Sequence, residues 1–302
     1  MSRPDPGVKT FISSMNLIIV IITGLLCLSH ADDHDGPLLP NNFMPFDFAM
    51  IPQHKLLFCR IHKAGSSALN HLLPAIAPPP FPQHPTWTYY QTSDYGLHSE
   101  DMIRILNDPS WVKVVIYRDP LERFLSAYRS KCEEFDQDNV CDDVFHKKRP
   151  TFAEAIRRLY LHIEVSPDSH FMRQADICNL RKTLPYFDEK FFLEPATSYE
   201  NIMRILDHAH IPITDSLNKT IYKNFPPPGT QTIITTHITH SADYSTLLQY
   251  YDHDCDIKLM THYYQEDYTL LKLPAPVWAL DALERVTLKE CEEKLKAHLL
   301  TP

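Results

Sequence analysis

A lysine, a glycine and two serines lie between a short apolar run and an amphipathic one within residues 55–73. Lys63 brings a full positive charge, and Gly65 lets the backbone approach an anion closely. If Ser66 and Ser67 begin a helix, the unpaired amides of its first turn add donors and a partial positive charge. We therefore predict a strand–turn–helix that cradles a phosphate-like group. The alternative is that Gly65 only permits a turn and that the serines only cap the helix.

The order of these residues does not fit a nucleoside triphosphate site. The triphosphatase loop has the pattern Gly-x-x-x-x-Gly-Lys-Ser/Thr, whereas Lys63 precedes the glycine of this turn. A nucleotide kinase, which requires ATP and magnesium, is therefore a poor interpretation of the motif. We expect the anion to belong to a different compound.

A second group of basic residues follows another apolar run. Arg118 leaves the carboxyl end of a predicted strand, where ligands of α/β sheets bind, and its planar guanidinium suits the oxygens of a phosphate. Ser126, in the helix that follows, adds a hydroxyl donor. The alternative is a structural ion pair between Arg118 and Asp119, with Ser126 as an ordinary helix residue. Basic residues outnumber acidic ones in this segment of a chain with net charge −9: Lys113, Arg118, Arg123, Arg129 and Lys131 against Asp119 and Glu122.

Strands and helices alternate in the pattern that these two sites require. Apolar runs of strand length cover residues 55–61, 111–117 and 190–195, and amphipathic patterns follow them. This alternation predicts an α/β fold, a P-loop-like three-layer sandwich with a mainly parallel sheet. We expect helices to begin at four capping residues: Ser99, Asp119 followed by Pro120, Thr151 in a capping box with Glu154, and Ser198.

The composition narrows the classes of function. The 302 residues are 44% hydrophobic, which is enough for a proper buried core. The negative net charge argues against a general nucleic-acid binder, whose surface would be broadly basic. No Cys-x-x-Cys pair and no other ligand cluster stands out in the sequence, so we expect no metal.

The first residues have the pattern of a segment that directs a chain into the secretory pathway. Arg3 and Lys9 precede an uncharged, largely apolar run at 11–29, and Ser29-His30-Ala31 resembles a signal-peptide cleavage site. A cleaved signal peptide and an uncleaved signal-anchor both fit this pattern. We divide the chain into this hydrophobic segment (1–31), a short proline-rich stem (32–54) and one lumenal domain (55–302).

Exposure to the lumen would allow the cysteines to form disulfides. Cys27 lies in the apolar segment, and Cys132 and Cys141 are close enough in sequence for a local bridge. The pairing of the others stays open: Cys59, Cys178, Cys255 and Cys291. Asn218-Lys219-Thr220 is an acceptor sequence for an N-linked glycan.

Several segments of the chain resemble one known family. "HKAGSS" at 62–67, followed by "VVIYRDPLERFLSAYRSKC" at 114–132, closely resembles the paired signatures of Golgi carbohydrate sulfotransferases, sulfotransferase family 2, which includes the chondroitin and HNK-1 type enzymes. Two positions depart from the family pattern, because His62 replaces a proline and Phe171 replaces a tryptophan. The similarity covers about residues 55–275 and continues in "SHFMRQADIC" (169–178), "FFLEPATSYENIMRIL" (191–206) and "YYQEDYTLLKL" (263–273).

The resemblance implies transfer of a sulfuryl group from 3′-phosphoadenosine 5′-phosphosulfate to a hydroxyl of a glycan. Lys63 would contact the bridging region and neutralise the leaving group. The 5′-phosphate would be held by the turn, through the loop amides and the two serines: Ala64, Gly65, Ser66 and Ser67. The 3′-phosphate would be held by Arg118 and Ser126, with Arg123 as a helper. The expected location is the Golgi membrane, with one N-terminal span and a lumenal catalytic domain, or else the secreted fraction.

The acceptor hydroxyl also needs a base, because an alcohol is a poor nucleophile at neutral pH. His170 is the first candidate, for the role of base or for contact with the acceptor. His98 and Glu100 are alternatives, and His62 beside the loop is a candidate for contact with donor or acceptor. A different function would keep the fold and lose the catalysis, which would make the chain a lumenal binding protein.

Overall fold

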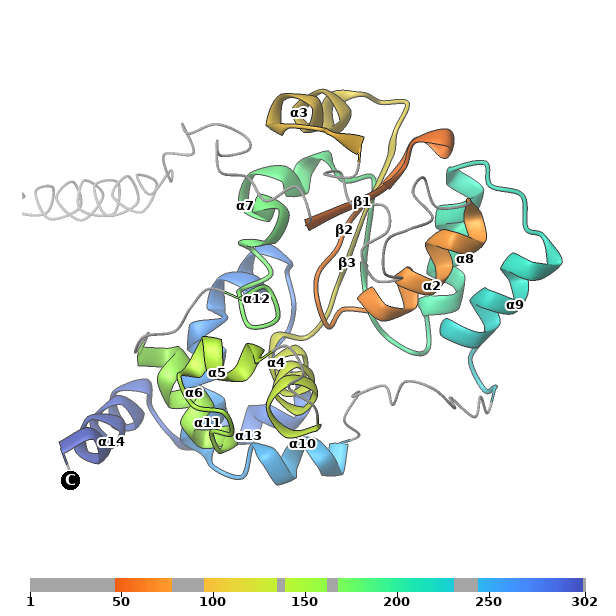
Figure 1. Cartoon of the computed structure of the whole chain (residues 1–302). Helices are drawn as coiled ribbons and strands as arrows, with labels where there is room; N and C mark the ends of the chain where they lie inside the picture. Colours follow the sequence, from red (N-terminus) through yellow and green to blue (C-terminus); the bar gives the residue numbers. More distant parts are fainter. Residues whose placement is uncertain (1–46, 78–94, 135–138, 162–167, 231–243, 301–302) are drawn as a thin grey trace, which may run out of the picture. The chain divides into compact units, whose positions relative to one another are not determined.

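The computed structural model describes residues 47–77, 95–134, 139–161, 168–230 and 244–300 (Figure 1). The predicted hydrophobic segment and most of the predicted stem lie outside these ranges. The chain divides into two units, Met1–Pro37 and Leu38–Pro302, and every described residue belongs to the second. In this described part, no helix has both the length and the apolar character that a membrane span requires.

Four strands form one sheet in the order β1-β2-β3-β4, as Figure 1 shows for the first three. Strands β2, β3 and β4 run parallel to one another, and β1 pairs with β2 in the antiparallel direction. The three predicted strands and the mainly parallel sheet are confirmed. The bounds of the strands are β1 Phe48–Ile51, β2 Leu56–Cys59, β3 Val112–Tyr117 and β4 Glu189–Phe192.

Strand β1 corrects the predicted boundary between stem and domain. We expected the stem to reach residue 54 and the folded part to begin at Lys55. Instead, Phe48–Ile51 is fully buried and pairs with β2 over its whole length, from Phe48 opposite Cys59 to Ile51 opposite Leu56. The sheet therefore begins inside the segment that we had assigned to the stem.

Helices cover both faces of the sheet and give the three layers that the sequence predicts. Alternate residues of β2 point to opposite faces, so that Leu56 and Phe58 pack in one cluster and Leu57 and Cys59 in another. The first face is covered by α2 Ser66–Ile76, α8 Ser198–His208 and α9 Asp215–Asn224. The second face is covered by α3 Ser99–Asn107 and by the short α7 Leu180–Thr183 (Figure 1).

A second group of helices packs around its own apolar core at the end of β3. Phe124, Phe152 and Tyr251 lie in this core, with ring centroids 5.4 Å apart for Phe124 and Phe152 and 4.9 Å apart for Phe152 and Tyr251. Its elements are α4 Pro120–Tyr128, a π-helix at Arg129–Glu134, α5 Val140–Phe145, α6 Phe152–Leu161, α10 Tyr244–Tyr250, α11 Asp254–Tyr263 and α13 Leu280–Arg285.

The remaining elements are short or lie at the edge. Helix α12 covers Gln265–Leu270, and α14 covers Leu288–Leu300, where Cys291 and Leu295 pack on Leu259 of α11. The 3-10 turns are Pro52–His54, Ile177–Asn179, Leu184–Tyr186 and Val277–Ala279.

Two of the four predicted helix starts are confirmed. Asp119 caps α4, since its Oδ1 accepts hydrogen bonds from the amides of Leu121 and Glu122, and Pro120 is the first helical residue. Thr151 and Glu154 form the predicted capping box ahead of α6, in which each side chain accepts a hydrogen bond from the other residue's amide.

The other two predicted caps are wrong by one residue. His98 caps α3 in a box with Asp101, so Ser99 is already helical. Ser198 is likewise the first residue of α8, and its hydroxyl donates to the backbone oxygen of Glu194 instead of accepting from an amide.

Three disulfides join the described cysteines. Cys132–Cys141 is the predicted local bridge. Cys255–Cys291 links α11 to α14, and Cys59–Cys178 spans 119 residues of sequence. Because Cys59 ends β2, the last bridge fixes the start of the Lys63 turn to Cys178, and both cysteines lie in the core on the face that α3 and α7 cover.

Candidate active site

The Lys63 turn connects β2 to α2 through two residues in the left-handed region of backbone angles. Lys63 and Gly65 both have left-handed backbone angles, with φ of 65° and 82°. Gly65 is the residue before α2, and it has no side chain to accept hydrogen bonds from the first amides of this helix. The side chain of Leu193, just after β4, would lie 3.4 Å from a Cβ at Gly65. Ends of the parallel strands β2 and β4 therefore meet at this turn.

Arg118 lies next to the Lys63 turn. Its Nη1 donates a hydrogen bond of 3.5 Å to the backbone oxygen of Lys63, and its Nη2 forms an ion pair of 3.1 Å with Glu122. The alternative pair with Asp119 is wrong, because Asp119 caps α4 and also accepts from the hydroxyl of Tyr268 at 3.0 Å. The two predicted anion sites are therefore direct neighbours at the carboxyl ends of β2 and β3.

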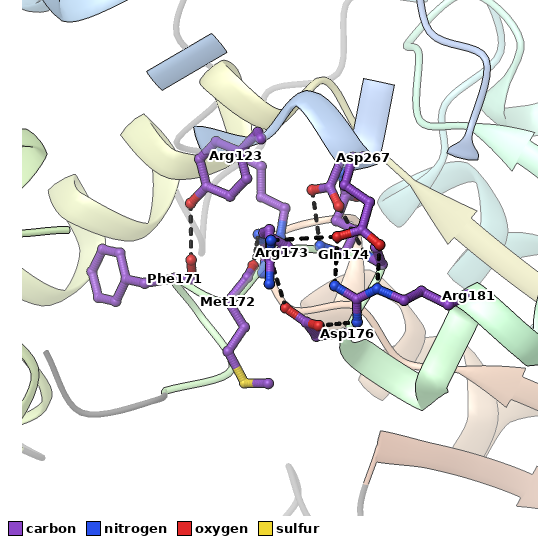
Figure 2. Close-up of polar contacts among 11 residues, drawn as sticks. Arg123, Phe171, Met172, Arg173, Gln174, Asp176, Arg181 and Asp267 are labelled. Carbon is purple, nitrogen blue, oxygen red and sulfur yellow. Dashed lines mark hydrogen bonds and ion pairs between the residues drawn. The ribbon is translucent and has the colours of Figure 1, made fainter. Parts of the chain in front are cut away.

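Arg123 has a different position from the one that we expected. Its side chain has no exposed surface, and its three nitrogens donate to backbone oxygens of His62 at 2.9 Å, Met172 at 2.6 Å and Ser169 at 2.8 Å. Figure 2 shows Arg123 reaching the segment that contains Met172. In this structure Arg123 is a positioning residue that joins the Lys63 turn to residues 168–174, and it is not placed to face a phosphate.

A chain of three polar side chains lies beside the Lys63 turn. The Oδ1 of Asp168 accepts hydrogen bonds of 2.8 Å from both the amide and the ring Nδ1 of His170. The other ring nitrogen of His170, Nε2, lies 3.2 Å from Nδ1 of His62. The structure therefore connects the predicted base to the residue that directly precedes Lys63.

Burial and neighbouring charges favour neutral rings at His62 and His170 and a charged carboxylate at Asp168. Burial lowers the pKa of His62 well below the ordinary value, and His170, Arg60, Arg123 and Lys63 lower it further. Burial also lowers the pKa of His170, although the hydrogen bond from its ring to Asp168 opposes this shift. Burial raises the pKa of Asp168, but the bonds and charge of His170 outweigh that effect, so the pKa lies below its usual value.

Asp267 of α12 holds the segment that carries His170 through hydrogen bonds. Asp267 accepts hydrogen bonds from the amides of Gln174 and Ala175 at 2.9 and 2.8 Å, and the Gln174 side chain pairs with both the amide and the carbonyl of Arg118. Figure 2 shows Gln174 beside Asp267, together with the ion pairs of Arg181. These ion pairs join Arg181 to Asp176 and to Glu266.

The remaining predicted residues have varied surroundings. Ala64 is buried, Ser66 is half-buried, and Ser67 is exposed at the start of α2, while Ser126 of α4 is only 4% exposed. His98 caps α3 and is exposed, as is Glu100 in the first turn of that helix. Within the described ranges, no group of three or more His, Cys, Asp or Glu side chains is arranged to hold a metal ion.

Sequence reasoning missed Asp168, Gln174 and Asp267, which position the site. Asp168 had a detectable signal, because an aspartate two residues before a histidine is well placed to accept from its ring and amide. Gln174 and Asp267 had none, since they are 93 residues apart and their contact depends on the packing of α12.

Comparisons with known proteins give one match. A family model described as the sulfotransferase family matches residues 46–274. This range includes all four strands, the Lys63 turn, Arg118 and the Asp168–His170 segment. Neither the comparison with curated proteins nor the one with solved structures found a match.

Proposed function

Because this chain belongs to the sulfotransferase family, we propose that it transfers a sulfuryl group from 3′-phosphoadenosine 5′-phosphosulfate to a hydroxyl of a glycan. The observation that carries this proposal is the 3.5 Å contact between Arg118 and the Lys63 backbone. It brings two separate anion-binding turns together at one edge of the sheet. A nucleotide with phosphates at both ends of its ribose is the kind of ligand that such a pair of turns suits.

The residues of the Lys63 turn fit the 5′ end of this donor. The free amides at the start of α2 and the hydroxyls of Ser66 and Ser67 are donors, and Gly65 adds no side chain between them and a ligand. Lys63 contributes a mobile positive charge. When bound, the donor supplies an electrophilic sulfuryl group and a phosphate leaving group.

Lys63 stabilises the negative charge that develops on the leaving phosphate oxygen as the bond between sulfur and that oxygen breaks. Arg118 and Ser126 hold the 3′-phosphate in this proposal, and Glu122 orients the Arg118 guanidinium. The protein thereby contributes position and electrostatics, which are its main tasks in transfers of this kind.

We also propose that the enzyme works in the Golgi lumen, either anchored by its N-terminal segment or secreted. The three disulfides support this location, since such bonds persist in oxidising compartments. The predicted glycan acceptor Asn218 lies on α9, which is an outer helix of the sheet, and we propose that it is modified there.

Transfer of labelled sulfate from the donor to a panel of desulfated glycans tests this function. We expect transfer to at least one glycan, and binding of adenosine 3′,5′-bisphosphate by calorimetry. Binding without transfer to any acceptor would identify the chain as a binding protein. Absence of both would contradict the proposal.

A further inference from the structure

The hydrogen bonds of Asp168, His170 and His62 fix the position of each ring proton. A carboxylate only accepts hydrogen bonds, so His170 must donate its Nδ1 proton to Asp168, at 2.8 Å. A neutral His170 then carries its lone pair on Nε2. The 3.2 Å contact with His62 can be a hydrogen bond only if Nδ1 of His62 donates to that lone pair. His62 is left with its own lone pair on Nε2.

Of the ring nitrogens in these hydrogen bonds, the one whose lone pair has no partner among the described residues is Nε2 of His62, and His170 has none. Both ring nitrogens of His170 have partners, one in Asp168 and one in His62. Among the described residues, none forms a hydrogen bond with Nε2 of His62, and this atom is not one of their fully buried, unpaired polar atoms. The backbone oxygen of His62 is held by Arg123, and the next residue is Lys63.

We infer that Nε2 of His62 accepts the proton of the acceptor hydroxyl, and that His170 and Asp168 position His62 and take up the charge. This inference rests on the proposed sulfuryl transfer. It replaces His170, our first candidate from the sequence, with its neighbour on the Lys63 turn. It also places the base and the cation that stabilises the leaving group on consecutive residues.

The bonds and charges of the step balance. The acceptor oxygen forms a bond to sulfur as the bond from sulfur to the 5′-phosphate oxygen breaks, and the electron pair of that bond stays on the phosphate. The hydroxyl proton moves to Nε2 of His62. The Nδ1 proton of His62 can then pass to Nε2 of His170, which leaves the positive charge on an imidazolium paired with the Asp168 carboxylate.

The surrounding charges favour the neutral, proton-accepting form of the His62 and His170 rings. Arg60, Arg123, Lys63 and His170 face His62, while Asp168, Lys131 and Lys63 face His170. Burial and the neighbouring cations lower the pKa of both rings from the ordinary value of histidine, which favours the neutral form of each ring. The single carboxylate at the far end favours passage of the proton away from the substrate.

Imidazole nitrogen chemical shifts of the full chain at neutral pH test the order of the protons without any turnover. Assignment uses the variants His62→Gln and His170→Gln. We expect both rings to be neutral with the proton on Nδ1. A proton on Nε2 of His62 would overturn the inference.

Kinetic measurements test the role of Nε2 of His62 as the base. We expect His62→Gln to lower kcat by about 10²- to 10⁴-fold, the usual contribution of a positioned base, with unchanged affinity for adenosine 3′,5′-bisphosphate. Asp168→Asn should lower kcat less than His62→Gln does. It should also move the acid limb of the pH profile of kcat to lower pH, because loss of the carboxylate lowers the pKa of His170. His208→Gln is the matched control, since this histidine also contacts a carboxylate, that of Glu189.

The outcomes separate this inference from the proposed function. Wild-type kcat and pH profile in His62→Gln, in a chain whose wild type transfers sulfate, would refute the inference and leave the function intact. If the wild type transfers no sulfate to any acceptor, the proposed function fails and His62 has no such role. The chemical shifts then still decide the order of the protons independently.

Discussion

The guanidinium of Arg118 contacts the backbone oxygen of Lys63, although the two residues are 55 positions apart in the sequence. This contact joins the turn after β2, which contains Lys63, to the turn after β3, which contains Arg118, in a single site. A ligand that binds there is therefore expected to depend on residues of both turns, in different ways.

Replacement of Lys63 and Arg118 should separate catalysis from binding. We expect Lys63→Ala to lower kcat by about 10²- to 10³-fold, because the charge on the leaving phosphate loses its stabilising cation. Arg118→Lys should weaken binding of adenosine 3′,5′-bisphosphate about tenfold, since it loses the planar fork but keeps the charge. Labelled transfer and calorimetry measure the two effects, and Lys190→Ala is an exposed control. Near-normal transfer by Lys63→Ala would refute the assigned role.

Gly65→Ala should weaken donor binding through backbone strain. An alanine at φ of 82° costs about 1–2 kcal/mol, and its relaxation would shift the amides at the start of α2. Gly229→Ala is a matched control, because Gly229 has a similar φ of 79° and no atom of the described residues lies within 4 Å of a Cβ there. Both variants should lose similar thermal stability, whereas only Gly65→Ala should lose affinity for adenosine 3′,5′-bisphosphate, by about tenfold. Equal affinities would exclude a role for this turn in binding.

Arg123→Lys should destabilise the fold, although it keeps the charge. A lysine cannot reach all three backbone oxygens that Arg123 bonds, and each buried acceptor left unpaired costs about 1–3 kcal/mol. We expect a loss of about 3 kcal/mol in denaturant unfolding. Arg204→Lys, on the exposed side of α8, should change stability by less than about 1 kcal/mol. A similar small change in Arg123→Lys would show that this arginine does not hold the segments together.

Asp256→Asn should stabilise the protein above pH 6. Burial raises the pKa of Asp256 to about 6, and its Oδ2 has no hydrogen-bond partner among the residues that the structure describes. Because the folded pKa is higher than the unfolded one, ionised Asp256 costs stability as the pH rises from about 4 to about 6. We expect a gain of about 1–3 kcal/mol at pH 7.5 that disappears near pH 4, measured by thermal unfolding at both values. Asp281→Asn, at an exposed position, is the control variant.

Local patterns in the sequence were sufficient to locate the parallel strands, although β2 and β4 end earlier than predicted, at Cys59 and Phe192. Leu56–Cys59 and Val112–Tyr117 are buried on both faces, which gives the continuous apolar runs that predict them. Strand β1 was missed because Pro45 and Pro52 lie close to the apolar run Phe48–Ile51, so that the segment has the pattern of a linker. It is a strand only because β2 offers it an edge to pair with.

The chemistry of the site was less predictable than its location. Arg123 has the residue type of a phosphate ligand, yet α4 is buried on nearly every side, so that its arginine reaches backbone oxygens instead. His62 and His170 are 108 residues apart, and only the folded chain brings their rings together. Sequence patterns predict which groups follow a strand, but the partners of those groups depend on long-range packing.

The bridge between Cys59 and Cys178 has a practical consequence for any study of activity. Cys59 lies just before His62, and Cys178 follows His170, so this covalent bond fastens the two halves of the proton chain to each other. In a host that folds the protein in a reducing cytosol, the Cys59–Cys178 disulfide is not expected to form. Enzyme for assay should therefore come from a secretory expression system, and its free-thiol content should be measured before an inactive preparation is interpreted.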